Sequence, residues 1–462
     1  MGKYQRLALL AFVLFAFTLA LFKASGWRVQ YGFRVPVPPA EQAVAQAKVA
    51  EQPLRKKNRH RSRRAEAPIA LTGRFETHFA SSKLHTQTHA ASLVELKDGR
   101  VRALWFSGSR EGASDVTINS AVFDPVRNVW GAEQVVAGRD STQRALHRYI
   151  AKVGNPVATR AADGTLWLFY VTVSLGGWAG SSISMMTSND DGASWSAPRR
   201  LVSSPFINIS TLVKGAPFLY ADGTMGLPVY HEFVSKFAEI LRLDKTGKVI
   251  DKQRLAAGGQ GTLQPVVLVQ SEKEALVFTR YSGNDAERRV VSIATGDGGR
   301  HWSKPAKSSL KNPDAALTAL VLADGKLLAV LNDQEWGRDS LSLQMSADGG
   351  GTWHELHRLE EMSGLRNKVM DEQTCVRLVE SLARTSDGKL EKAAGPQLTG
   401  HVDSARARVN ADGGCAFEFS YPYMIQTHNG DIHVVYTWNR TFIKHLVFDR
   451  AWLQHRLKEH QS

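Results

Sequence analysis

The chain has 462 residues, 43% of them hydrophobic and 22% charged, which is typical of globular proteins rather than disordered ones. This length can bury a large core, in one large domain or in two or three smaller ones. The net charge is +14, but the run 55–64 (RKKNRHRSRR) holds seven of the Lys and Arg residues. The sequence has no zinc-finger spacing, helix-turn-helix pattern or aromatic-basic RNA motif, so its charge does not indicate nucleic-acid binding.

The N-terminal segment is apolar. Residues 7–22 (LALLAFVLFAFTLALF) follow Lys3 and Arg6. This run is slightly short for a full membrane span and long for a signal-peptide core. Because Lys23 follows at once, without a small-residue cleavage site, we expect an uncleaved signal anchor over residues 1–23, with a cleaved signal peptide as the alternative. The anchor would make the membrane a partner and leave the rest exported, on the periplasmic or extracellular face.

Residues 24–69 are rich in Pro, Ala and basic residues and lack a steady apolar period, which predicts a linker. From residue 70 to residue 450, short alternating runs are separated by Asp-Gly and Asn-Gly turns, for example at Asp98-Gly99 and Asn429-Gly430. Such turns between strands are the strongest short hairpin signal. The pattern predicts an all-β sandwich, barrel or propeller. Residues 360–412 look like an insertion with helical segments, either a lid or a spacer, and residues 451–462 look like a tail.

An internal repeat decides among these architectures. Three copies of Ser/Thr-x-Asp-x-Gly-x-x-Trp each follow an alternating strand, at 188–195, 295–302 and 346–353, and 123–130 is a degenerate fourth. The repeated Asp residues are Asp190, Asp297 and Asp348. In this motif an Asp caps a tight turn, a Gly supplies the unusual dihedral angle and the Trp packs over the hairpin. We therefore assign these Asp residues to structure rather than catalysis.

The repeats are Asp boxes, and with the text around them the chain resembles the sialidase-like superfamily of BNR-repeat proteins. That resemblance implies a six-bladed β-propeller whose active site lies on the central axis, with the Asp boxes on the outer rim. It matches Arg280 and Arg338 to arginines that clamp the substrate carboxylate, a task suited to a planar guanidinium. It matches Asp115 to the acid/base.

Other parts of the family site differ here. His89, in HAAS, stands in place of the first triad arginine, and Gln264 in place of the glutamate that activates the nucleophilic tyrosine. The simple register puts Phe419 at the nucleophile, and Tyr421 replaces it only if the strand bulges. The stretches HAAS, EFSYP (418–422) and YTWNRTFIKH (436–445) resemble a divergent branch of the superfamily.

Several candidate residues also have structural interpretations. His89 could orient or protonate a substrate or could be a core histidine, and Asp115 could be a general acid or a turn cap. His231 and Glu232 are adjacent on a strand, so only one of them should face the axis. We assign His231 to substrate binding, with Arg280, Arg338 and Gln264. Whether Cys375 and Cys415 form a disulfide stays open.

Three functions are compatible with these residues. The first is a sialidase-like glycoside hydrolase acting on an acidic sugar of extracellular glycans. The second is a uronic-acid-glycan lyase or rhamnosidase-like propeller, with His and Tyr as acid and base. The third is a non-catalytic glycan-binding propeller. We expect a monomer that needs no cofactor and no metal, with Asp115, Tyr421 and His89 as the catalytic residues in the first case.

Overall fold

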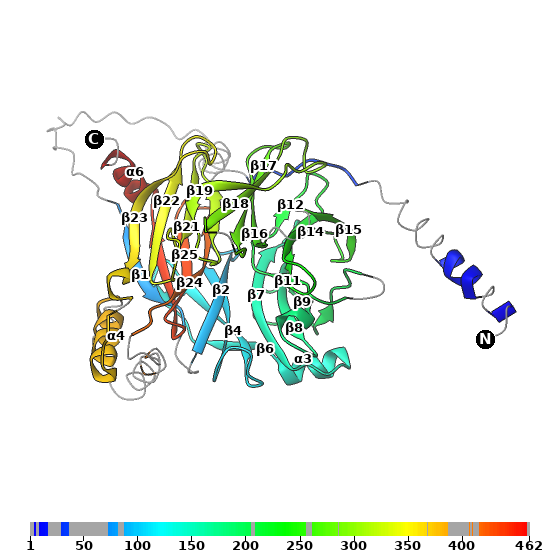
Figure 1. Cartoon of the computed structure of the whole chain (residues 1–462), viewed down its shortest axis with the longest axis horizontal. Coiled ribbons are helices and arrows are strands. Elements are labelled where there is room, and N and C mark those ends of the chain that lie inside the picture. The colour runs from blue at the N-terminus through cyan, green and yellow to red at the C-terminus, as the bar shows by residue number, and fades with distance from the viewer. Residues whose placement is uncertain are drawn as a thin grey trace, which may run out of the picture.

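Short strands recur from residue 75 to residue 448 and pair mostly with their sequence neighbours in antiparallel sheets, as the hairpin signals predict. The computed structural model describes residues 4–5, 9–16, 29–36, 73–81, 87–204, 208–255, 261–284, 286–366, 368–386, 406, 409 and 415–459. Within these residues the strands form six sheets, which we call blades I–VI in chain order (Figure 1). The predicted six-bladed β-propeller is thus confirmed.

Blades I–III follow one another from residue 87. Blade I consists of β2 (Gln87–Glu95), β3 (Val101–Gly108), β4 (Thr117–Asp124), β5 (Val129–Trp130) and β6 (Gln134–Gly138). Blade II consists of β7 (Lys152–Arg160), β8 (Leu166–Val173), β9 (Ser181–Ser188) and β10 (Arg199–Arg200). Blade III consists of β11 (Leu212–Val213), β12 (Phe218–Leu219), β13 (Met225–His231), β14 (Phe237–Leu243) and β15 (Val249–Arg254).

Blades IV–VI complete the propeller. Blade IV consists of β16 (Thr262–Val269), β17 (Ala275–Tyr281), β18 (Arg289–Thr295) and β19 (Ala306–Lys311). Blade V consists of β20 (Thr318–Val321), β21 (Leu327–Leu331), β22 (Ser340–Ser346) and β23 (His354–Glu361). Blade VI consists of β24 (Phe419–Gln426), β25 (Ile432–Trp438), β26 (Phe442–Phe448) and β1 (Phe75–Phe79).

The ring closes through blade VI, in which the early strand β1 pairs with β26 from the end of the chain. Around the axis, β24 contacts β2, β2 contacts β7 and β7 contacts β11. On the other side β13 contacts β16, β16 contacts β20 and β20 contacts β24. Pairing the two ends of the chain in one sheet leaves no open edge between the first blade and the last.

The two ends of the propeller differ. The inner strands start at one end, together with the helices α3 (Arg139–Leu146) and α4 (Glu372–Ser386), which lie at the lower edge of Figure 1. The 3-10 turns η1 (Trp178–Gly180) and η2 (Ser363–Leu365) follow β8 and β23, two strands that end there. We call this end the site end. The Asp boxes follow the third strands β9, β18 and β22 at the opposite end, which we call the Asp-box end.

Part of the predicted linker packs on the propeller. Phe33 is fully buried and forms a β-bridge with Tyr220, and its ring stacks on the Tyr220 ring. Backbone bonds from Gly32 to Gly298 and from Phe33 to Glu272 fix the segment on blades III and IV at the Asp-box end. Residues 29–36 are therefore an ordered strap, and the linker prediction for 24–69 is wrong over this stretch because a buried aromatic ring and backbone pairing hold it.

The predicted tail is also ordered in part, since α6 (Arg450–Glu459) packs Trp452 and Leu453 against blades V and VI. In the predicted insertion, α4 is joined to the start of blade VI by a disulfide between Cys375 and Cys415. No helix in the described residues is long and apolar enough to cross a membrane, and the predicted anchor, residues 1–23, lies mostly outside them.

Candidate active site

One unusual backbone feature recurs at the site end. Each blade has, at or just before the start of its inner strand, one non-glycine residue with φ between 44° and 63°: Ala90, Asn155, Ser210, Gln264, Asp314 and Tyr421. In blades I, II, IV and VI the strand register shifts at this residue, which marks a β-bulge. Left-handed non-glycine residues cost roughly 1–3 kcal/mol each and gather at functional sites. The propeller thus holds a ring of strained positions around its axis.

Tyr421 lies at a β-bulge, which is the condition under which the sequence allowed it to take the place of Phe419. Its φ is 54°, and the register of β24 against β25 shifts between Ser420 and Tyr423. The bulge places the Tyr421 ring beside His89 of blade I, with 4.4 Å between ring centroids. Phe419, the residue of the simple register, is instead fully buried in the core. The tyrosine is therefore the residue that reaches the axis.

His89 is buried, with 3% of its surface exposed, and its Nδ1 has no hydrogen-bond partner in the described part of the chain. Burial lowers the pKa of His89 to about 4, although Glu418 and Glu111 act in the opposite direction. At neutral pH this imidazole is therefore uncharged. It therefore does not carry the extra proton that the role of acid would need.

Arg280 and Arg338 come together through Asp314. Arg280 Nε donates to Asp314 Oδ1 at 2.6 Å, and Arg338 Nη2 donates to the Asp314 carbonyl oxygen at 2.7 Å. Burial acts to lower the pKa of Arg280, but the nearby Tyr421 and Asp314 outweigh it and raise that pKa. Arg280 Nη1 also donates to Gln264 Oε1 at 3.2 Å, so the three predicted residues of blades IV and V form one group.

A third arginine joins the site from blade VI. Arg440 Nε donates to Glu418 Oε2 at 2.7 Å, and Arg440 Nη1 donates to Glu111 Oε2 at 2.9 Å. Arg338 Nη1 reaches the same Glu418 at 3.4 Å. Burial alone would raise the pKa of Glu418, but His89, Arg440 and Arg338 together hold it well below its ordinary value. Glu418 is therefore an anion that orders two guanidinium groups.

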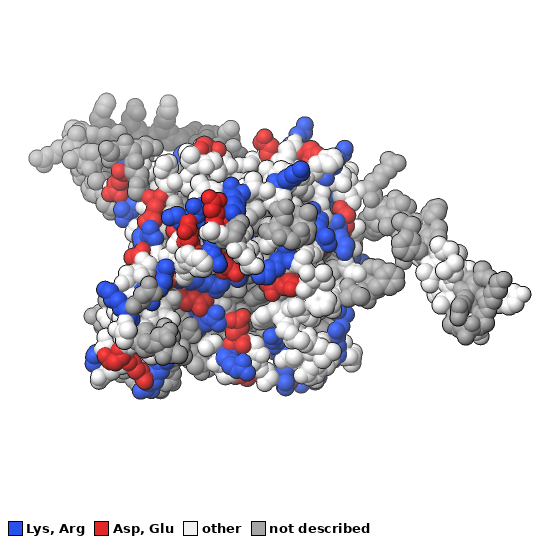
Figure 2. Space-filling view, viewed as in Figure 1, with Lys and Arg blue, Asp and Glu red and all other residues white. Residues whose placement is uncertain are grey.

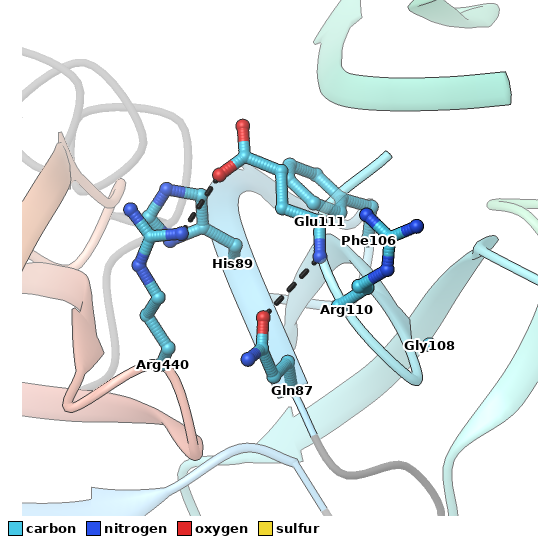
Figure 3. A pocket seen from close by; sticks show the side chains of 7 residues that line it. All are labelled: Gln87, His89, Phe106, Gly108, Arg110, Glu111 and Arg440. Atoms are coloured by element: carbon cyan, nitrogen blue, oxygen red, sulfur yellow. Dashed lines mark hydrogen bonds and ion pairs between the residues drawn. The ribbon is translucent and has the colours of Figure 1, made fainter. Parts of the chain in front are cut away.

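Figure 3 shows a narrow pocket between blades I and VI, lined by His89, Glu111 and Arg440 among other residues. The Glu111 carboxylate points toward the Arg440 guanidinium, and the His89 ring lies beside them. The backbone N–H of Glu111 donates to Gln87 Oε1 at 3.2 Å, which fixes the loop after β3. The pocket therefore combines a neutral imidazole with a charged pair.

The opposite wall of the site comes from blades II–IV. The Tyr230 hydroxyl accepts hydrogen bonds from Asn155 Nδ2 and Gln264 Nε2, both at 3.3 Å. Two residues later, Glu232 lies near enough to Arg280 to interact with it electrostatically. Burial raises the pKa of Glu232, with Arg280 acting in the opposite direction. A carboxyl with a raised pKa is suited to donating a proton.

Two predicted residues lie outside this group. His231 Nε2 contacts Glu239 Oε2 at 3.0 Å and its ring stacks on Phe237, on the other face of β13 from Tyr230. Of the pair His231 and Glu232, the glutamate faces the axis. Asp115 is exposed and accepts hydrogen bonds from the backbone N–H and hydroxyl of Ser109, as a turn cap does.

The Asp-box carboxylates cap the turns that follow the third strands of blades II, IV and V. Asp190, Asp297 and Asp348 each accept hydrogen bonds from a backbone N–H four residues on, at 2.9 Å. For Asp190 the side-chain hydrogen bonds from Ser194 and Ser188 contribute most, and for Asp297 and Asp348 the backbone bonds do; they hold the pKa of all three carboxyls well below the ordinary value. They lie at the end of the propeller opposite His89 and Arg280, so they order hairpins and do not touch the site.

The sequence interpretation missed Glu111 and Arg440 as site residues, and of the pair His231 and Glu232 it assigned the site role to His231. Glu111, Glu232 and Arg440 each follow the second strand of their blade. Arg280 and Arg338 lie at the end of, or after, the second strands of blades IV and V. That shared position was the usable signal. Among the described residues, no three His, Cys, Asp or Glu side chains are grouped so that they could hold a metal ion.

Comparison with known proteins agrees with the propeller fold. The profile of the BNR repeat-like domain matches residues 99–434, well over half of the chain. The chain belongs to this family. A comparison with curated protein sequences finds no match.

Solved structures similar to this BNR repeat-like protein share its fold at low identity. The Hadza microbial sialidase Hz136 is 15% identical with a TM-score of 0.57, over 80% of this chain and 66% of that one. A Dyadobacter fermentans protein of unknown function is 12% identical with a TM-score of 0.56, over 81% and 97%. The intramolecular trans-sialidase from Ruminococcus gnavus is 11% identical with a TM-score of 0.55, over 81% and 96%. The chain thus spans just under two thirds of the length of Hz136.

Proposed function

We propose that the protein is a glycoside hydrolase of sialidase type that acts on an acidic sugar of extracellular glycans. The observation that carries the proposal is the convergence of Tyr421 and His89 with Arg280, Arg338 and Arg440 at the start of the inner strands. The structural relatives include enzymes named as sialidases and trans-sialidases, which supports the reaction class by analogy.

The arginines are suited to holding the carboxylate of an acidic sugar. A guanidinium has five N–H donors, and the bonds that Arg280 makes within the described residues use only Nε and Nη1. Asp314 and Glu418 hold Arg280 and Arg338 in place, so little side-chain entropy remains to be lost on binding. Two-point hydrogen bonds to a carboxylate are strong because both partners are charged.

Tyr421 would act as the nucleophile. Its oxygen attacks the anomeric carbon while the glycosidic C–O bond breaks, and its proton passes to neutral His89. Glu232 gives a proton to the departing oxygen. In the second half, water attacks the same carbon and gives a proton to Glu232, and Tyr421 recovers its proton from His89. This pairing replaces the tyrosine–carboxylate pair with a tyrosine–histidine pair, since Gln264 cannot act as a base.

The test is release of the aglycone from aryl glycosides of acidic sugars. We expect Tyr421→Phe to lower kcat by at least about 1000-fold, as loss of a nucleophile does. Arg280→Ala should lower kcat/KM on the order of 100-fold, through loss of a charge-assisted hydrogen bond to the substrate. Tyr149→Phe, at an exposed tyrosine, and His231→Ala serve as matched controls that should keep activity. Wild-type release no faster than that of Tyr421→Phe would overturn the proposal.

A lyase acting on uronic-acid glycans is the second candidate, and the observation that favours it is a neutral His89 with an open Nδ1. In a β-elimination the arginines would neutralise the uronate carboxylate, His89 would take the proton beside it, and Tyr421 would protonate the departing oxygen. The product is a conjugated unsaturated sugar, whose ultraviolet absorbance separates this reaction from hydrolysis. Binding on a glycan array without either product would instead indicate a glycan-binding propeller.

We also propose an exported location. The Cys375–Cys415 disulfide supports it, because disulfides persist in oxidising compartments. Membrane attachment through residues 1–23 stays a prediction, and detergent dependence of release from membranes would test it.

A further inference from the structure

One buried cation of the axis has no part in the reaction described above. Lys214 follows β11 of blade III and is 3% exposed. Its Nζ donates to the carbonyl oxygen of Pro422 in blade VI at 3.2 Å. Blades III and VI are opposite each other in a six-bladed ring, so this side chain crosses the axis.

The acceptor of that bond is created by the bulge. The register of β24 shifts between Ser420 and Tyr423, so Tyr421 and Pro422 lie outside the β24–β25 ladder. A buried carbonyl without a partner costs about 1–3 kcal/mol, and the lysine supplies the missing donor. Lys214 Nζ also lies 4.9 Å from the ring centroid of Tyr423 and 6.0 Å from that of Tyr421. It therefore contacts the backbone or the ring of each residue at the bulge.

The backbone next to Lys214 also packs closely against a neighbouring blade. A Cβ on the next residue, Gly215, would lie 2.0 Å from the carbonyl oxygen of Pro265, the residue after the left-handed Gln264 of blade IV. Only glycine permits this approach of the backbone. The Lys214–Gly215 segment therefore passes directly against one bulge and reaches across to another.

We propose that Lys214 is a positioning residue that holds the Tyr421 bulge, and with it the nucleophile, in its left-handed conformation. Through the Pro422 carbonyl it keeps the Tyr421 ring against His89 and within reach of Arg280. Burial lowers the pKa of Lys214 to about 7, and the ammonium and the neutral amine both retain N–H donors for this bond. The catalytic part of this inference rests on the proposed function, whereas the hold on the bulge does not.

The first experiment compares Lys214→Met, which removes the donor, with Lys444→Met as a matched buried-lysine control. Lys444 is 5% exposed and pairs with Glu360 away from Tyr421. We expect Lys214→Met to lower kcat on the order of 100-fold, the effect of misplacing a reacting group by about 1 Å, with KM changed by less than about 3-fold. Lys444→Met should lower thermal stability but keep the kcat of the folded enzyme. Lys214→Gln retains an N–H donor and should recover part of the rate.

The second experiment needs no substrate. Hydrogen–deuterium exchange should rise in peptides covering β24 in Lys214→Met and stay unchanged in β17. In Lys444→Met it should stay unchanged in β24. Unchanged exchange in β24 of Lys214→Met, or an equal rise in every blade, would overturn the inference. If wild type turns over no acidic sugar, the proposed function fails, and the exchange result alone decides the role of Lys214.

Discussion

At the residue scale, the site is built from side chains whose charge differs from what their type alone suggests. His89 is neutral because it is buried, and Glu418 is charged although it is buried, because guanidinium groups face it. Neither state follows from local sequence, since the burial of His89 is tertiary and the guanidinium groups that face Glu418 lie 22 and 80 residues away in the chain. The tyrosine–histidine pair inferred above depends on this difference.

The pH dependence of catalysis follows from His89. A neutral base is required, so kcat/KM, which reports on the free enzyme, should fall on the acid side as pH drops through about 4. On the alkaline side it should fall as Glu232, whose pKa burial raises, loses the proton that it donates. His89→Gln should lower the rate and remove this acid limb. The pH–rate profiles of wild type and of His89→Gln measure this acid limb. An acid limb centred near 6.5, the ordinary pKa of histidine, would contradict the assignment.

The bulges are the part of the site that the sequence could have predicted further. Gly-Asn-Pro at 154–156, Leu-Gln-Pro at 263–265 and Ser-Tyr-Pro at 420–422 each place a proline after a left-handed residue. Proline lacks the ladder donor and is confined to edges and bulges of sheets, so three such triplets indicated three bulges. Lys214, the partner of the Tyr421 bulge, lies 208 residues from Pro422 and could not be read in this way.

At the element scale, the closing strand β1 has a feature of its own. His78 of β1 is opposite His445 of β26, and His445 Nε2 contacts His433 Nδ1 of β25 at 2.9 Å. All three rings are buried. Burial lowers the pKa of His433 to about 3 and that of His445 well below its ordinary value, with help from Arg74 and His78. The other charged groups at this seam are Glu76, near His78, and Asp431, paired with Arg74.

This histidine stack predicts that blade VI weakens in acid. The unfolded chain binds protons below about pH 6.5, while the folded histidines stay neutral, so the free energy of unfolding falls as pH falls. Each such histidine removes about 1.4 kcal/mol per pH unit until its folded pKa is reached. Urea unfolding between pH 7 and pH 5 measures the slope. In His433→Asn this slope should be smaller by the contribution of one histidine, about 1.4 kcal/mol per pH unit. A slope equal to that of wild type would contradict the prediction.

At the scale of the whole molecule, the strap fixes how the N-terminal segment meets the propeller. It docks at the Asp-box end, opposite His89 and Tyr421. On the face seen in Figure 2, Lys and Arg side chains are interspersed with Asp and Glu rather than gathered in one basic area. This agrees with a net charge of which half lies in residues 55–64.

Removing the strap should destabilise the propeller. Phe33 is fully buried among Tyr220, Phe218 and Trp302, so Phe33→Ala should lower the free energy of unfolding by about 3 kcal/mol. Tyr31→Ala, at an exposed tyrosine of the strap, is the control and should change it little. Chemical denaturation of a variant lacking residues 1–28 should resemble wild type, whereas loss of residues 1–36 should resemble Phe33→Ala. Equal stability of all these variants would show that the strap is not part of the folding unit.

The sequence by itself determined the propeller, because hairpins and Asp boxes are local: a turn of two to eight residues carries its own glycine, carboxylate and tryptophan. Through a family resemblance it also predicted one site of Arg280, Arg338, Gln264, His89 and Tyr421 together with Asp115 and His231. Only the tertiary structure decided that Tyr421 rather than Phe419 lies beside His89, that Glu232 rather than His231 faces the axis, and that Asp115 caps a turn. Those outcomes depend on bulges, burial and charge partners from different blades, and such contacts between distant residues leave no periodic signal in the chain.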